Sequence, residues 1–282
     1  MTNIRDLDPS ASPLAYYGAE LRRLREAANL NQKQLGAILY CTGSLIGQIE
    51  TARKLPTREF SERVDAALGT EGSLSRLLPL VLRSQLPPWF QQYAEMEARA
   101  SYINMFQTQL VLGLLQTEEY ARAVLSALVK DRLDERVAAR MERQRILKRE
   151  NPPLVWVVLC EAVLHQGIGG RRVMRNQLAH LLSYQDAEWV QIQVLPFSMG
   201  VHAGLMGSFT VFRFDDDPDI TYTEGYEAGY FTADPKAVKD RALRYDHLQA
   251  AALSVEKSAE LIARVMEELY AEPSATDGHT MA

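Results

Sequence analysis

Apolar residues recur at helical spacing in two short stretches near the beginning of the chain, residues 32–39 and 43–51. The apolar positions that share a face are Leu35, Ile38 and Leu39 in the first stretch and Leu45, Ile46 and Ile49 in the second. Two apolar stripes of this kind can pack against each other when the chain reverses between them. The pattern therefore predicts two short helices joined by a tight turn.

The polar positions of the second stretch suggest what this pair of helices does. Ser44, Gln48 and Thr51 point away from the apolar face and carry uncharged hydrogen-bonding groups. Such groups suit the base edges in a DNA major groove. Asn31 and Thr42 precede the two helices and can cap them, at ends where a DNA phosphate could dock. These features are typical of a helix-turn-helix that reads DNA.

Residues 30–56 resemble the lambda-repressor-like, or Xre-type, helix-turn-helix. The matching residues are Leu30, Gln32, Leu35, Ser44, Ile49, Glu50, Arg53 and Pro56. The chain departs from the family at Gly36, where Ala is usual, and at Ala52, where Gly is usual. The departure at Ala52 matters because the turn after the reading helix often needs a residue with positive φ.

This resemblance implies roles for individual residues. Those that would face DNA bases are Gly43, Ser44 and Gln48, although Gly43 has no side chain to read with. Those that would contact the DNA backbone are Gln32, Thr42, Thr51, Arg53 and Lys54. The resemblance also implies a five-helix, all-α domain.

The charge of the motif region differs from that of the chain. Residues 14–58 contain seven Lys or Arg and three Glu, a local charge of +4, whereas the whole chain has a net charge of −5. A patch this small predicts weak nonspecific DNA binding by one copy. We therefore expect a homodimer on an operator with two half-sites.

The composition is that of an ordinary globular protein, with 47% hydrophobic and 24% charged residues. No apolar run approaches the length of a membrane span and no signal-peptide pattern opens the chain, so the sequence predicts a cytoplasmic protein without membrane contact. Cys41 and Cys160 lie outside any CxxC or Cys/His cluster and are interpreted as small core residues.

Turn signals divide the chain into two domains. We expect a helix-turn-helix domain over residues 14–86 and a second domain over residues 88–270, separated near Pro87 and Pro88. Ser12 and Pro13 mark the start of the first helix, and Thr57 can cap a helix after the motif. The ends, residues 1–13 and 272–282, are small and polar and are predicted to be flexible.

The second domain mixes helical and strand patterns. Helices are expected at about 88–100, 117–129, 133–150, 171–185, 235–252 and 255–270, and strands at 154–160, 190–197, 208–214 and 220–225. The arginine-rich helix after residue 133 has an apolar stripe and is expected to be solvated or to face a dimer partner. Because the later strands follow one another after short turns, we expect an α+β domain with an antiparallel sheet.

This half also resembles a known group. The phrases GLLQTEEYARAVL at 113–125, PPLVWVVLCEAVL at 152–164 and VQIQVLPFSMGVHAG at 190–204 are similar, in this order, to the C-terminal domain of actinomycete Xre-type regulators. That group includes WhiJ-like developmental regulators and antitoxin-like proteins. The resemblance implies a transcriptional regulator, often encoded beside a small acidic partner protein.

Four residues outside the motif are candidates for a small-molecule or partner pocket. Glu161 and His165 follow a strand, His202 lies between glycines in a loop, and Tyr222 lies in a later strand. In the alternative interpretation the glycines only shape the loop, and Glu161 and His202 make local hydrogen bonds. Because nucleophile, zinc-hydrolase and phosphate-loop patterns are lacking, we expect no catalytic residue, no cofactor and no metal ligand, and therefore no enzyme.

Two functions remain open. One is a sequence-specific regulator that binds double-stranded DNA as a homodimer and whose second domain receives a partner or small-molecule signal. The other is an antitoxin-like interaction factor that binds the small acidic partner and uses DNA binding for autoregulation.

Overall fold

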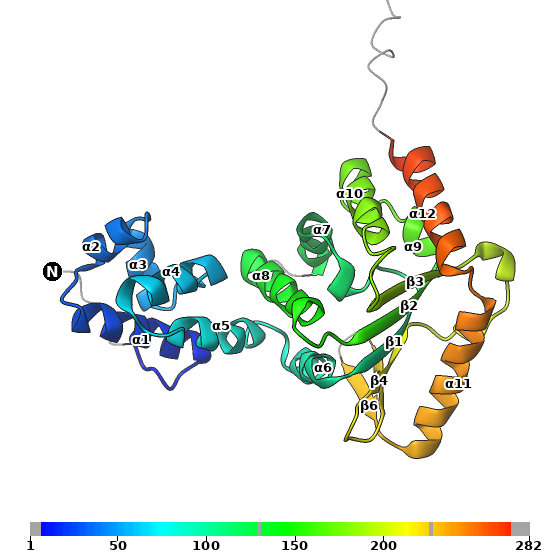
Figure 1. The fold of residues 1–282 in the computed structure, drawn as a ribbon, viewed down its shortest axis with the longest axis horizontal. Coiled ribbons are helices and arrows are strands. Elements are labelled where there is room, and N and C mark those ends of the chain that lie inside the picture. Colours follow the sequence, from blue (N-terminus) through cyan, green and yellow to red (C-terminus); the bar gives the residue numbers. More distant parts are fainter. Residues whose placement is uncertain (1–6, 129–130, 226–227, 272–282) are drawn as a thin grey trace, which may run out of the picture. The chain divides into compact units, whose positions relative to one another are not determined.

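The computed structural model of the chain describes residues 7–128, 131–225 and 228–271 (Figure 1). Of the ends predicted to be flexible, 1–13 and 272–282, residues 1–6 and 272–282 lie outside the described residues. The chain divides into two compact units, residues 1–91 and 92–282. Each unit has its own core and is described separately below.

The first unit contains five helices followed by the start of a sixth. They are α1 (Pro13–Ala27), α2 (Gln32–Ile38), α3 (Gly43–Glu50), α4 (Arg58–Leu68) and α5 (Ser73–Arg83), and α6 (Pro88–Arg99) begins here and continues into the second unit. Their shared core is a cluster of buried side chains that includes Tyr17, Leu21, Leu35, Ile46, Ile49, Phe60, Val64 and Leu74. The expectation of a five-helix N-terminal region is confirmed.

Capping side chains fix where these helices begin. Ser12, Asn31, Thr42 and Thr57 each accept a hydrogen bond from a backbone N–H in the first turn of α1 to α4, as the sequence predicts. Helix α5 has no such residue of its own. The carboxylate of Asp65 on α4 accepts the Leu74 and Ser75 N–H groups instead, so α4 holds the start of α5.

The apolar face of α2 is narrower than predicted. Leu35 and Leu39 are buried, but Ile38 is 47% exposed. Helix α2 ends at Ile38 after seven residues, and the chain then reverses at Tyr40, which has φ 54°. Of the three apolar side chains predicted to share a face, only Leu35 and Leu39 therefore reach the core.

The second unit alternates helices and strands. Its strands are β1 (Tyr102–Gln107), β2 (Leu154–Cys160), β3 (Val190–Leu195), β4 (Phe209–Arg213), β5 (Ile220–Glu224) and β6 (Gly229–Thr232). Its α-helices after α6 are α7 (Glu118–Leu128), α8 (Leu133–Arg143), α9 (Ala162–His165), α10 (Arg171–Leu182), α11 (Pro235–Ala251) and α12 (Val255–Tyr270). Short 3-10 turns are η1 (Gly113–Leu115), η2 (Gln144–Lys148) and η3 (Phe197–Met199).

The prediction of an antiparallel sheet is wrong, because the six-stranded sheet is mixed. Its order is β3-β2-β1-β4-β5-β6, with β1, β2 and β3 parallel and β4 to β6 antiparallel. Helices α7 and α8 connect β1 to β2, and helices α9 and α10 connect β2 to β3. Each connection returns the chain to the same end of the sheet, so β1, β2 and β3 run parallel. The sequence pattern had not indicated β1, which is the central strand that joins the two halves.

Helices cover both faces of this sheet (Figure 1). On one face, Tyr245 and Leu248 of α11 pack against Phe106, Val158 and Val211. On the other face, the Tyr93 ring of α6 contacts the rings of Phe212 and Tyr222. The unit is therefore a three-layer α+β domain, and strand parity decides which layer each side chain meets.

An ion pair is buried beneath this second face. Glu97 of α6 is 1% exposed and accepts two hydrogen bonds of 2.8 Å from the Nε and Nη2 atoms of Arg143 on α8. Arg140, one turn earlier on α8, donates to Gln116 at 3.0 Å. Part of the arginine-rich helix therefore faces the interior, contrary to the expectation that it is solvated or faces a dimer partner.

Replacing Glu97 with Gln should lower the free energy of unfolding by about 3 kcal/mol, because Arg143 stays buried after losing its carboxylate partner. Urea denaturation followed by tryptophan fluorescence measures the loss. The matched control is Asp134→Asn, which removes one of the two carboxylate partners of Arg122, both in exposed pairs, and should change little. Equal losses in the two variants would contradict a special role for the buried pair.

Candidate nucleic-acid interface

Glycines let α2 and α3 cross at backbone contact. A Cβ atom added to Gly36 would lie 2.8 Å from the Cys41 carbonyl oxygen and 2.9 Å from the Gly43 nitrogen. A Cβ on Gly43 would lie 3.0 Å from the Cα of Lys33. The N-terminal turns of the two helices are therefore adjacent. Gly36, where the resembling family has Ala, is a small residue at this crossing.

A buried ion pair ties α3 to α1. Glu50, at the last position of α3, is completely buried, and its carboxylate accepts hydrogen bonds from Arg25 Nε at 2.5 Å and Arg25 Nη2 at 3.1 Å. The same guanidinium donates to the Leu30 carbonyl at 2.7 Å. The hydrogen bonds that Arg25 donates to Glu50 raise the pKa of Arg25 above its ordinary value. The Arg25 guanidinium therefore stays charged and links α1 to the end of α3 and to Leu30.

Gln32 joins this cluster from the first turn of α2. Its Nε2 atom donates to Glu50 Oε2 at 2.8 Å. Room for the Gln32 amide exists because Gly47 has no side chain, since a Cβ there would lie 3.1 Å from Gln32 Oε1. The structure thus places Gln32, a predicted DNA-backbone residue, at the α2 N-terminus with its amide bound inside the domain.

The side of α3 opposite the core is polar and open. Ser44 and Gln48 are both exposed. Thr51 is half-buried, and its hydroxyl donates to the Gly47 carbonyl at 2.7 Å. Thr42 is exposed, and its hydroxyl accepts the Leu45 N–H at 3.2 Å. The two predicted base-reading side chains are therefore free to contact a ligand, whereas the hydroxyls of Thr42 and Thr51 are engaged with the helix backbone.

Cations flank the exposed side chains of Ser44 and Gln48, which we call the polar stripe of α3. Lys33, Arg53 and Lys54 are exposed, and none of them forms an ion pair with any described residue. The backbone N–H groups of Arg53 and Lys54 donate to the Gln48 carbonyl, which fixes both residues directly after α3. Positive charge therefore lies beyond the C-terminus of α3, at Arg53 and Lys54, and next to its N-terminus, at Lys33 of α2.

Sequence reasoning had missed two features of this surface. It included Glu50 only as part of a family pattern, although a charged residue four positions after buried Ile46 signals a buried partner. It also missed Tyr40, which is 91% exposed and holds φ 54° in the turn between the helices. A tyrosine in this conformation is unusual, and no sequence pattern marks it.

The structure brings together some of the candidate residues of the second unit. Glu161 Oε2 accepts the Phe197 N–H at 2.7 Å, and Glu161 Oε1 lies 3.5 Å from His165 Nε2. The His202 ring lies against Phe106, and its Nδ1 accepts the Gly204 N–H at 3.1 Å. These are the local hydrogen bonds of the alternative interpretation.

Tyr222 lies apart from this group. It pairs with Thr210, which pairs with Met105, and residues paired across antiparallel strands share a face. Phe106, which His202 contacts, follows Met105 and faces the opposite side. Within the described residues, no group of three His, Cys, Asp or Glu could hold a metal ion, and no helix is long and apolar enough to cross a membrane.

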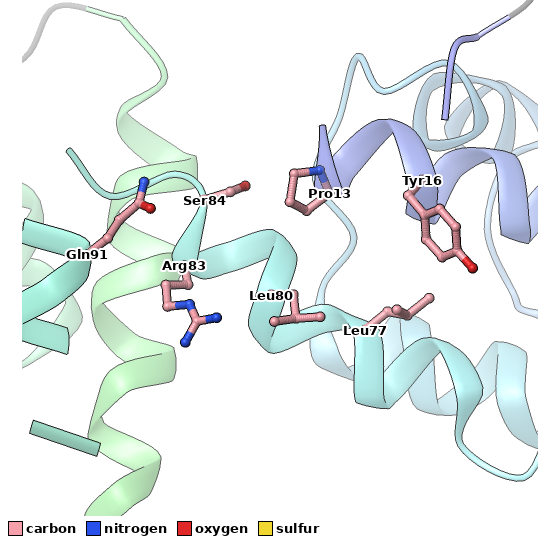
Figure 2. Close-up of a pocket in the computed structure, with 7 residues that line it drawn as sticks. All are labelled: Pro13, Tyr16, Leu77, Leu80, Arg83, Ser84 and Gln91. Carbon is pink, nitrogen blue, oxygen red and sulfur yellow. The ribbon is translucent and has the colours of Figure 1, made fainter. Parts of the chain in front are cut away.

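The first unit also has an apolar groove with a volume of about 370 Å³ (Figure 2). Pro13 and Tyr16 of α1 and Leu77 and Leu80 of α5 line it, together with Arg83, Ser84 and Gln91. None of the residues predicted to contact DNA lines the groove. It is therefore separate from the polar stripe on α3.

Comparison with known families identifies two regions of the chain. Residues 17–78 match a helix-turn-helix domain, and residues 90–264 match a family described as a domain of unknown function, DUF5753. No curated protein and no solved structure matches the chain. A helix-turn-helix domain indicates DNA binding and transcriptional regulation.

Ala52→Gly should stabilise the first unit. Ala52 follows α3 with φ 54°, a conformation that costs a residue with a Cβ roughly 1 kcal/mol and costs Gly almost nothing. Thermal unfolding monitored by circular dichroism measures the gain. The control is Ala66→Gly at an exposed position inside α4. It should lower the stability of the first unit, because Gly is a poor helix former. A loss of stability in Ala52→Gly would contradict the strain.

Proposed function

Because the chain belongs to the DUF5753 family and carries a helix-turn-helix domain, we propose that it regulates transcription by binding specific DNA sequences through α3. The observation that carries this proposal is the exposed polar stripe of Ser44 and Gln48 on a helix whose other sides are fixed by α1 and α2. A rigid helix presents its side chains to base edges at low entropic cost.

The surroundings of the stripe favour a phosphate backbone on either side of it. Arg53 and Lys54 follow α3, and Lys33 stands in the first turn of α2 next to the start of α3. The backbone amides at the N-termini of both helices add partial positive charge. We assign phosphate contacts to Gln32, Thr42, Thr51, Arg53 and Lys54. Gln32, Thr42 and Thr51 lie at helix ends, and their side chains already bond within the domain.

We further propose that the active form is a homodimer on two half-sites. Few cations surround the stripe, and each phosphate contact adds only a limited, salt-sensitive gain in affinity. Two copies double the contacts and read a longer sequence. Since the second unit contributes none of the assigned DNA contacts, we assign to it dimerisation and the reception of a partner or ligand signal.

Replacing both Ser44 and Gln48 with Ala should abolish discrimination between specific and scrambled DNA, at a cost of about 1 to 3 kcal/mol per side chain. The specific duplex is the one that the wild-type protein selects from a random-sequence library, and fluorescence anisotropy gives both affinities. Asn29→Gly, which changes another exposed, uncharged residue, should keep full discrimination. Failure of the wild type to enrich any sequence, or unchanged discrimination in the double variant, would refute the assigned face.

Arg53→Ala should weaken binding to every duplex by a similar factor and reduce the slope of log affinity against log salt by about 1, because one phosphate contact is lost. Titrations at several salt concentrations measure the slope. Arg76→Ala on α5 removes another exposed arginine outside the motif and should leave the slope unchanged. An unchanged slope in Arg53→Ala would remove this residue from the phosphate contacts.

A further inference from the structure

The loop after β3 exposes more large apolar side chains than its length requires. Phe197, Val201, Leu205 and Met206 are all exposed, with Val201 at 85% and Met206 at 90%. We call residues 197–206 the apolar loop. Scattered apolar side chains on a surface are normal, but several within ten residues mark a contact surface.

This loop is anchored, so its exposed side chains are held outward. At its start, Glu161 accepts the Phe197 N–H, and in its middle Gly204 lies directly on the Phe106 ring, leaving no space for a Cβ. After the loop, Ser208 Oγ accepts the Thr108 N–H at 3.0 Å. An anchored loop keeps its apolar surface in one arrangement, which lowers the entropic cost of binding.

The charge pattern indicates what covers the loop. Residues 189–212, which include β3, the loop and most of β4, contain no Asp, Glu, Lys or Arg. In a two-fold interface the side chains next to the axis meet their own copies, so a charge there would face a like charge. A partner attracted by electrostatic complementarity would instead need charges on this surface. The uncharged segment fits a second copy of this chain.

The size of the loop also fits this role. Its exposed side chains supply on the order of 500 Å², compared with about 800 Å² per partner in a standard-sized interface. The loop can therefore form the apolar centre of an interface with a polar rim. Pairing through the edge of β3 is hindered, because Val194 already bonds to Leu253 and Ser258.

We infer that the apolar loop is the surface through which two copies of this chain form the dimer. The inference rests on the proposed function, since it supplies the dimer that two half-sites require. Met206→Glu tests it, because the new carboxylates of the two copies would lie close together across the axis. The control is Leu243→Glu on α11, which also replaces an exposed apolar side chain of the second unit with a carboxylate.

Sedimentation equilibrium of the full chain should give a dimer for the wild type and for Leu243→Glu, and should show a dimer dissociation constant at least roughly tenfold higher for Met206→Glu. Circular dichroism should be the same for all three. A monomeric wild type would overturn the inference. A Met206→Glu variant that dimerises as tightly as the wild type would overturn it as well.

DNA binding separates this inference from the proposed function. Met206→Glu should bind a duplex with one half-site as the wild type does and lose the gain that the wild type obtains from a second half-site. If the mass changes as expected but no variant binds DNA, the dimer surface stands and the proposed function fails. If DNA binding is specific but the mass of Met206→Glu equals that of the wild type, the function stands and the surface fails.

Discussion

The first unit depends on the buried ion pair between Arg25 and Glu50. A buried carboxylate is costly unless every oxygen is paired, and here Arg25 and Gln32 satisfy it from two other segments of the chain. Displacement of α3 relative to α1 or α2 would leave a charge buried without its partner. The pair therefore links the three helices α1, α2 and α3 in one arrangement.

Close backbone packing completes what the ion pair begins. Gly18 of α1 lies against the end of α3, where a Cβ would come within 2.7 Å of the Ile49 carbonyl oxygen, and Gly36 does the same at the start of α3. Both ends of a helix of only eight residues are thus held by its neighbours. The polar stripe becomes a rigid surface because little of α3 can move independently.

Local sequence signals predicted the features that depend on neighbouring residues. The two short helices of the motif and the caps at Ser12, Asn31, Thr42 and Thr57 follow from side chains within four positions of each helix start. The outward position of Ser44 and Gln48 follows from helical spacing. The family pattern also marked Ala52 as a place for positive φ, and the residue has that conformation.

Features that depend on distant residues could not be predicted in this way. Arg25 and Glu50 are separated by 25 positions, and no periodicity links them. Strand β1 carries Asn104 and Gln107 among its apolar residues and is flanked by no strong turn signal, so its pattern is weak. Without β1, the crossovers that make half of the sheet parallel were invisible, and the remaining strands suggested an antiparallel order. The four candidate pocket residues do not lie together, because Tyr222 and His202 are on opposite faces of the sheet.

We expect DNA binding through α3 to depend on the buried Arg25–Glu50 pair, although neither residue is assigned a DNA contact. Arg25→Lys tests it most directly, since lysine keeps the charge but cannot make the two parallel hydrogen bonds to Glu50. Operator affinity should fall at least roughly tenfold while circular dichroism still reports a folded helical domain, and Arg23→Lys, at an exposed arginine of the same helix, should bind as the wild type does. Wild-type operator affinity in folded Arg25→Lys would contradict the account.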